Sequence, residues 1–153
     1  MAKNRSLKTL LETEFKTLPL SPEWLQTLGE VPINFSMLIA GPSGSGKTTF
    51  ALHLARYLST LGKVYYNSAE QGFSKSLKDQ IIKAGLAHSS EAKFMVGDKD
   101  GYEAMVAKIK STHPRFVILD SVNVLGLTFE QFTALVAGHK GKSFILIAWG
   151  GAK

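Results

Sequence analysis

The spacing of hydrophobic residues in the first part of the chain is helical. Four apolar side chains occur there at relative positions i, i+3, i+4 and i+8: Leu7, Leu10, Leu11 and Phe15. This spacing predicts a short amphipathic helix. A second helix is predicted after Ser21, a favoured N-cap residue, because Pro22 suits the first helical position and Gly29 is a stop signal. We interpret residues 1–30 as a helical lead-in segment that packs on a main domain comprising residues 31–153.

From residue 36 onward, short apolar runs alternate with stretches of helical periodicity. The apolar runs predict five strands, at residues 36–40, 63–67, 93–96, 116–119 and 143–149. Strands that alternate with helices of 10–15 residues are typical of βαβ units around a parallel sheet. Because the last two runs do not alternate with polar residues, their strands should be buried on both faces. The pattern therefore predicts a three-layer α/β fold with helices on both faces of the sheet.

Start and stop signals place the helices between these strands. One helix should span residues 48–61, where Gly62 ends it, and another should carry Leu77, Ile81 and Ala84 and close at Gly85. Two capping-box patterns predict the starts of the last two helices: Asp100 with Glu103, and Thr128 with Gln131.

Composition narrows the class of protein. The chain has 153 residues and no cysteine, which excludes disulfides, thiolate zinc sites and cysteine nucleophiles. No apolar run approaches the roughly 18 residues of a membrane span, and charged residues near the start argue against a signal peptide. We therefore expect a cytoplasmic protein with no membrane partner. The net charge of +6 is spread along the chain and is only a weak indication of a polyanionic partner.

The segment from Gly41 to Thr48 matches the phosphate-loop pattern G-x-x-x-x-G-K-[ST] in full, between a predicted strand and a predicted helix. Its glycines let backbone N–H groups surround a phosphate at the N-terminus of a helix. The ammonium group of Lys47, expected to be exposed, would reach the β- and γ-phosphates, and the hydroxyl of Thr48 would join the shell of a Mg²⁺ ion. An ordinary glycine-rich turn is the alternative that this context disfavours. The expected nucleotide-binding residues are Gly41, Pro42, Ser43, Gly44, Ser45, Gly46, Lys47, Thr48 and Thr49.

Two carboxylates follow other predicted strands. Asp120 ends the apolar run at residues 116–119, where a P-loop protein holds Mg²⁺, although aspartate is also common in turns. Glu70 follows the second strand, where a carboxylate could orient and deprotonate water, or could be a solvated loop residue. The carboxyl ends of parallel strands share one edge of a sheet, so both should lie near the phosphate loop.

These motifs, GPSGSGKTTF, SAEQG, VILDS and FILIAW, resemble those of RecA-type ATPases, and most closely the RadA, DnaB and KaiC-like branch. The resemblance covers residues 31–153. It implies a P-loop NTPase fold with a five-stranded parallel sheet in the order 3-2-4-5-1. It also implies that Glu70 is the catalytic base, and that Asp120 and Ser121 are the Asp-Ser pair after the fourth strand. This order leaves residues 36–40 at an edge, so we expect residues 1–30 to cover that edge or the protein to self-associate.

The chain departs from the family pattern at Trp149, which stands where the family has a polar sensor. Packing in the core is the alternative interpretation of this residue. The chain also lacks a well-placed arginine to neutralise transition-state charge. Arg56 lies too far along its helix, Arg115 precedes the fourth strand, and Arg5 belongs to the lead-in segment. The missing cation should come from another subunit, where Lys153 is a candidate, from a partner protein, or from sequence outside these 153 residues.

The sequence thus predicts a Mg²⁺-dependent ATPase that binds ATP and ADP, with Lys47 and Glu70 in catalysis and Thr48 and Asp120 as metal ligands. The expected role is in DNA recombination, repair or replication, and the expected partners are DNA and further copies of the chain. Two alternatives stay open: a nucleotide-gated binding module with little hydrolysis, and a small-molecule or nucleoside kinase.

Overall fold

The computed structural model of the chain describes residues 3–89 and 93–150. The chain divides into two compact units, Met1–Phe35 and Ser36–Lys153. None of the described helices is long and apolar enough to cross a membrane.

The first unit contains two short helices, α1 (Leu7–Glu12) and α2 (Pro22–Leu28). As predicted, the hydroxyl of Ser21 caps α2 and Gly29 ends it with a positive φ of 72°. Helix α1 is shorter than predicted, because the chain turns extended at its C-cap Thr13. Its leucines are exposed, and the expected packing of this segment on the main domain stays a prediction.

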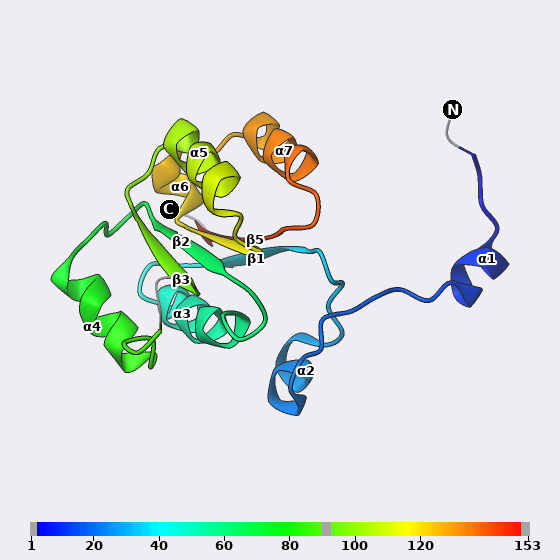
Figure 1. Ribbon diagram of the computed structural model, residues 1–153, viewed down its shortest axis with the longest axis horizontal. Helices are drawn as coiled ribbons and strands as arrows, with labels where there is room; N and C mark the ends of the chain where they lie inside the picture. The colour runs from blue at the N-terminus through cyan, green and yellow to red at the C-terminus, as the bar shows by residue number, and fades with distance from the viewer. Residues whose placement is uncertain (1–2, 90–92, 151–153) are drawn as a thin grey trace. The chain divides into compact units, whose positions relative to one another are not determined.

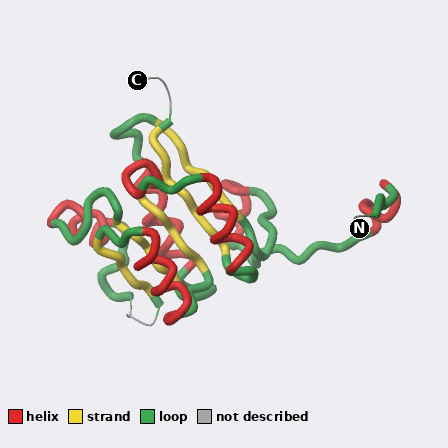
Figure 2. Tube along the Cα trace, turned by 90° about the horizontal axis from the view of Figure 1, so that it is seen from above, coloured by secondary structure: helices red, strands yellow, loops and turns green. Residues whose placement is uncertain are grey.

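The second unit is a parallel five-stranded sheet with helices on both faces (Figures 1 and 2). The strand order is β1-β5-β4-β2-β3, which confirms the predicted order. The strands and helices follow one another as β1 (Ser36–Gly41), α3 (Lys47–Leu58), β2 (Val64–Ser68), α4 (Lys75–Lys83), β3 (Phe94–Asp98), α5 (Tyr102–Thr112), β4 (Phe116–Asp120), α6 (Val122–Leu125), α7 (Phe129–Gly138) and β5 (Ser143–Trp149).

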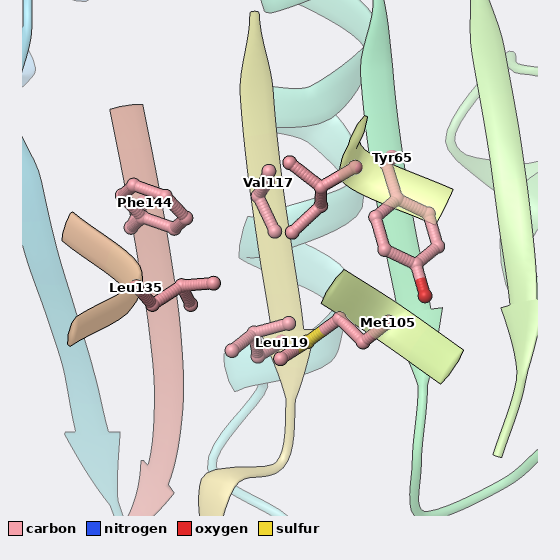
Figure 3. Close-up of a cluster of buried hydrophobic side chains, with 7 residues drawn as sticks. Tyr65, Met105, Val117, Leu119, Leu135 and Phe144 are labelled. Atoms are coloured by element: carbon pink, nitrogen blue, oxygen red, sulfur yellow. The ribbon is translucent and has the colours of Figure 1, made fainter. Parts of the chain in front are cut away.

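The layers are built around the three central strands. Helix α3 packs on one face of the sheet, next to α4, and helices α5 and α7 lie on the other face (Figure 1). On the second face, the core joins side chains of β2, β4 and β5 to residues of α5 and α7 (Figure 3), among them Tyr65, Met105, Val117, Leu119, Leu135 and Phe144. Strand β4 is buried along its whole length, as predicted from its apolar run. Strand β5, for which the same prediction was made, is half-buried at Leu146 and Ala148 and exposed at Trp149, because it ends at the open carboxyl edge of the sheet. Strand β2 is buried throughout as well.

Strand β1 lies at one edge of the sheet and pairs with β5 alone. The side chain of Leu38, in the middle of this strand, is 63% exposed. An exposed edge strand is open to pairing with another chain. Whether another segment covers β1 stays a prediction.

The capping signals are confirmed at one helix and wrong at another. Thr128 and Gln131 form the predicted capping box at the start of α7. Helix α5, in contrast, begins after Gly101, and the carboxylate of Asp100 does not cap it. Instead, Asp100 Oδ2 accepts hydrogen bonds from Tyr65 Oη and from Lys108 Nζ, each 2.6 Å away. The predicted capping box failed because a neighbouring strand and the second turn of α5 supply stronger donors.

Two other features differ from the sequence prediction. Helix α3 ends at Leu58 rather than at residue 61, and a tight turn continues to Gly62. A Cβ atom at Gly62 would lie only 2.8 Å from the side chain of Arg115, so the turn requires glycine. The short helix α6 is not signalled by periodicity because it is a single turn, which the hydroxyl of Ser121 caps.

Candidate nucleotide-binding site

The predicted phosphate loop connects β1 to α3 at the carboxyl edge of the sheet. Gly44 and Gly46 have positive φ angles of 76° and 88°, a conformation that favours glycine. Gly46 is the N-cap of α3 and no side chain caps this helix. The first backbone N–H groups of α3 are therefore directed at the loop, where a phosphate would complete their hydrogen bonding.

Lys47 is half-buried rather than exposed, contrary to the sequence expectation. Its Nζ donates to the carbonyl oxygens of Gly41 and Pro42, at 2.8 and 2.7 Å, and lies 3.5 Å from Ser45 Oγ. These contacts hold the ammonium group over the loop. A phosphate in the loop would meet this positive charge at short range.

Asp120 lies at the end of β4, and its side chain faces the start of α3. Its Oδ2 accepts a hydrogen bond from Thr48 Oγ1 at 2.7 Å and a second one from Tyr66 Oη. The two residues expected to hold a metal are therefore in direct contact, although they are far apart in sequence. Carboxylate and hydroxyl oxygens are the hard donors that Mg²⁺ prefers, so this pair fits the ion.

Tyr66 is a site residue that the sequence did not reveal. It is fully buried in β2, and burial, followed by the charge of Asp120, raises the pKa of its hydroxyl well above the ordinary value. The phenol thus stays protonated and donates to Asp120. Nothing near Tyr66 in the sequence signals this contact, which follows only from the pairing of β2 with β4.

Glu70 lies two residues beyond the end of β2, and its backbone N–H donates to the carbonyl oxygen of Asp120 at 3.0 Å. One carboxylate oxygen, Oε2, accepts a hydrogen bond from the indole Nε1 of Trp149 at 3.3 Å. The side chain of Trp149 is 51% exposed, so the interpretation of this residue as core packing is wrong. Its backbone N–H is in turn bound by Oδ1 of Asn123, on α6, at 2.8 Å.

A cleft of about 420 Å³ lies at the carboxyl edge of the sheet, beside the phosphate loop. The phosphate loop and Thr49 form one wall, and Glu70, Asp120 and Trp149 form another. Polar residues after β2 and on α4, absent from the sequence prediction, complete the lining: Gln71, Ser76 and Gln80. Gln71 Nε2 donates to Gln80 Oε1 at 3.0 Å, and Gln71 Oε1 is buried without a hydrogen-bond partner among the described residues.

The arginines of the second unit lie away from this cleft. Arg115 precedes the first residue of β4, so it lies at the edge of the sheet opposite the cleft. Its Nη1 donates to the carbonyl oxygen of Leu61 at 3.0 Å. Arg56, in the last turn of α3, lies against Gly85. Lys153, the candidate for a trans-acting cation, falls outside the described residues. Within the described ranges, no group of three or more histidine, aspartate or glutamate side chains could hold a metal ion, so Mg²⁺ would rely on Thr48, Asp120 and the nucleotide's phosphates.

Comparison with known proteins agrees with this geometry. The fold and the cleft define a RecA-type P-loop ATPase core. The chain belongs to the AAA domain family, whose profile matches residues 2–127.

Two relatives are informative. The chain is 27% identical over 89 residues to a DNA repair protein RadA from Streptococcus pneumoniae, a match that covers 58% of this chain and 20% of that protein. It thus spans about a fifth of the length of this relative. The crystal structure of a KaiC-like protein from Pyrococcus horikoshii superposes with a TM-score of 0.65 and 16% identity, covering 92% of this chain and 73% of that one. At this identity, the second likeness shows the shared fold alone.

Proposed function

We propose that this chain binds ATP together with Mg²⁺ and hydrolyses it, and that it does so in DNA recombination, repair or replication. The observation that carries the proposal is the contact between Thr48 Oγ1 and Asp120 Oδ2 beside the phosphate loop. It brings the two predicted metal ligands together at the edge where Lys47 and Glu70 also lie. Members of the family to which the chain belongs are ATPases.

Each residue has a separate task in this proposal. The backbone N–H groups at the start of α3 and the ammonium group of Lys47 bind the phosphates. Thr48 and Asp120 would hold Mg²⁺, which, when bound, neutralises charge on the β- and γ-phosphates. Tyr66 keeps Asp120 oriented through its buried hydroxyl. Glu70 accepts the proton of the attacking water, because its carboxylate lines the same cleft as Lys47 and Thr48.

The proposed hydrolysis is slow for an isolated chain. An arginine finger is worth about 10³–10⁵ in rate in related phosphoryl-transfer sites. Arg56 and Arg115 are both engaged elsewhere in the structure. A second copy of the chain, a partner protein or a further segment of the protein would therefore supply the cation.

A role on DNA draws support from the relative named DNA repair protein RadA and from the basic charge of the chain. A second candidate, a nucleotide-gated binding module with little hydrolysis, is favoured by one contact. The indole of Trp149 occupies a carboxylate oxygen of Glu70, and a base that is held in this way is less free to accept a proton.

The test is to titrate ATP and ADP by calorimetry with and without Mg²⁺, and to measure phosphate release with and without single- and double-stranded DNA. The proposal predicts Mg²⁺-dependent ATP binding and a low rate of release that DNA increases. Tight binding without any release, under all these conditions, would favour the binding module. Absence of ATP binding would overturn both candidates.

A further inference from the structure

Four neighbouring strands of the sheet each begin directly after a basic residue. We call these residues the strand-start cations: Lys142 before β5, Arg115 before β4, Lys63 before β2 and Lys93 before β3. The first residues of these strands are paired in register, Ser143 with Phe116, Phe116 with Val64, and Val64 with Phe94. The cations therefore form one row across the amino edge of the sheet, opposite the nucleotide cleft.

Backbone hydrogen bonds fix the row. Ser143 N donates to Arg115 O, Arg115 N donates to Lys63 O, and Val64 N donates to Lys93 O, each at 2.9 Å. Adjacent strands in a sheet lie about 4.8 Å apart, so the backbones of the four strand-start cations follow one another at short intervals along this edge. Such a row is a property of the fold, since the four residues are widely separated in sequence.

The charged groups of three of these residues are held in place by carbonyl oxygens. Lys63 Nζ donates to Thr112 O at 2.9 Å, Lys142 Nζ donates to Pro114 O at 2.6 Å, and Arg115 donates to Leu61 O. Each ammonium or guanidinium group has more donors than these bonds use. The ion pairs found in the described ranges are those of Lys8, Lys75 and Lys108, so no carboxylate there neutralises the row.

Further positive groups surround the row. Burial and then the charge of Lys63 lower the pKa of Lys142. Burial and then the charges of Lys142 and Lys110 lower the pKa of His139. Lys142 thus lies close to Lys63 and to His139, and Lys110 also lies close to His139. The contact of Lys63 with the last turn of α5 stabilises that helix end, but helix capping does not explain why all four strands begin after a cation.

We propose that this amino edge of the sheet binds the phosphate backbone of a nucleic acid. The inference rests on the proposed role on DNA and names the surface that would contact it, on the side away from the nucleotide cleft. Fixed cations with unused donors match phosphate oxygens, which dominate the affinity of proteins for nucleic acids.

An anionic membrane is the less suitable partner for the same charges. Surfaces that lie on membranes combine basic residues with exposed apolar side chains. The residues that flank Lys63, Arg115 and Lys142 in the chain include no exposed large hydrophobic side chain: Gly62, Val64, Pro114, Phe116, Gly141 and Ser143. The geometry therefore favours a nucleic acid.

The experiment measures fluorescence anisotropy of labelled single-stranded and double-stranded DNA with the full chain, over a range of salt concentrations. The test variant is Lys63→Gln with Lys142→Gln. The matched control, Lys78→Gln with Lys83→Gln, removes the same charge from exposed positions on α4 that form no ion pair within the described ranges. A Lys63→Arg, Lys142→Arg variant keeps the charge, and thermal unfolding verifies that each variant is folded.

The wild-type chain is expected to bind DNA, with an affinity that falls steeply with salt. Each lost phosphate contact lowers the slope of log K against log[salt] by about 0.9 on double-stranded DNA and about 0.7 on single strands. The test variant, which loses two contacts, should thus show a slope that is smaller by about 1.8 on double-stranded DNA or about 1.4 on single-stranded DNA. Its affinity at 0.1 M salt should be lower by roughly tenfold for each lost contact. The control and the arginine variant should bind as the wild type does. The form of DNA, single- or double-stranded, for which the test variant loses more affinity is the preferred partner.

Three results would overturn the inference: equal losses in the test and control variants, no binding of either DNA by the wild type, or binding to phosphatidylserine vesicles without binding to DNA. ATP binding, measured on the same samples, separates this inference from the proposed ATPase. If the wild type binds no ATP while the test variant binds DNA more weakly than the wild type does, the ATPase proposal fails and the proposed DNA surface stands. If Lys47→Ala weakens ATP binding while none of the variants changes DNA binding, the phosphate loop stands as the ATP site and the proposed DNA surface fails.

Discussion

The indole N–H of Trp149 donates a hydrogen bond to the carboxylate of Glu70, with 3.3 Å between Nε1 and Oε2. Trp149 ends β5 beside Gly41, the first residue of the phosphate loop, and Glu70 follows β2. The bond therefore connects the proposed base to the strand that adjoins the start of the phosphate loop. It also gives a residue that departs from the family pattern a definite contact in the cleft.

Trp149→Phe should raise the rate of ATP hydrolysis, because it removes the donor that restrains Glu70 and keeps an aromatic ring. A hydrogen bond of this kind contributes about 1 kcal/mol, so the expected increase in kcat is up to about fivefold, with little change in KM. Steady-state phosphate release measures both constants. The control is Trp24→Phe, which changes the other tryptophan of the chain. A lower kcat in Trp149→Phe would instead show that the indole holds Glu70 in its productive orientation.

Lys47→Ala should weaken ATP binding by roughly ten- to a hundredfold, because a charge-assisted hydrogen bond contributes about 1.5–3 kcal/mol. The fold should survive, since the lysine contacts only carbonyl oxygens and a hydroxyl of its own loop. Calorimetric titration with ATP gives the affinity, and Lys78→Ala, on the exposed side of α4, is the control. Equal affinity in mutant and wild type would refute the phosphate loop as the binding site.

Tyr66→Phe should lower the free energy of unfolding by about 1.5–3 kcal/mol. The substitution removes a hydroxyl that donates to the buried carboxylate of Asp120, and hydrogen bonds to buried charged groups have this magnitude. Urea unfolding of both proteins measures the difference. An unchanged midpoint and slope would show that Thr48 alone satisfies Asp120.

Turnover per chain should rise with protein concentration. The arginines of the second unit lie away from the cleft, and β1 is an edge strand of the sheet that could pair with another copy. Phosphate release measured over a wide range of concentrations, together with sedimentation, tests both features. A dilute monomer that hydrolyses ATP rapidly, at a rate per chain independent of concentration, would exclude a cation supplied in trans by another copy.

Local signals and the family resemblance predicted different parts of this structure. The phosphate loop and the capping box of Thr128 and Gln131 depend on residues close in sequence, and the structure places both where they were expected. The order of the strands came from the resemblance, because periodicity alone does not specify which strands are neighbours.

The contacts that the sequence could not predict join residues from different strands. Asp100 has the spacing of a helix cap but accepts from Tyr65 on β2 instead. Tyr66 has the pattern of an ordinary sheet residue, and its bond to Asp120 exists only because β2 lies beside β4. Trp149 meets Glu70 for the same kind of reason, since both follow strand ends at one edge of the sheet. Tyr66 and Trp149 thereby connect the proposed metal ligand and the proposed base to the sheet.

The role of Glu70 as the base is tested most directly by ATP hydrolysis in Glu70→Gln, which preserves the size of the side chain and its ability to accept from Trp149. Phosphate release at saturating ATP and Mg²⁺ should be measured beside calorimetric ATP binding on the same preparations. If Glu70 deprotonates the attacking water, ATP affinity is retained while the rate of release falls by about 10²- to 10⁴-fold. Turnover at the wild-type rate would contradict this role and would leave Glu70 as a solvated loop residue.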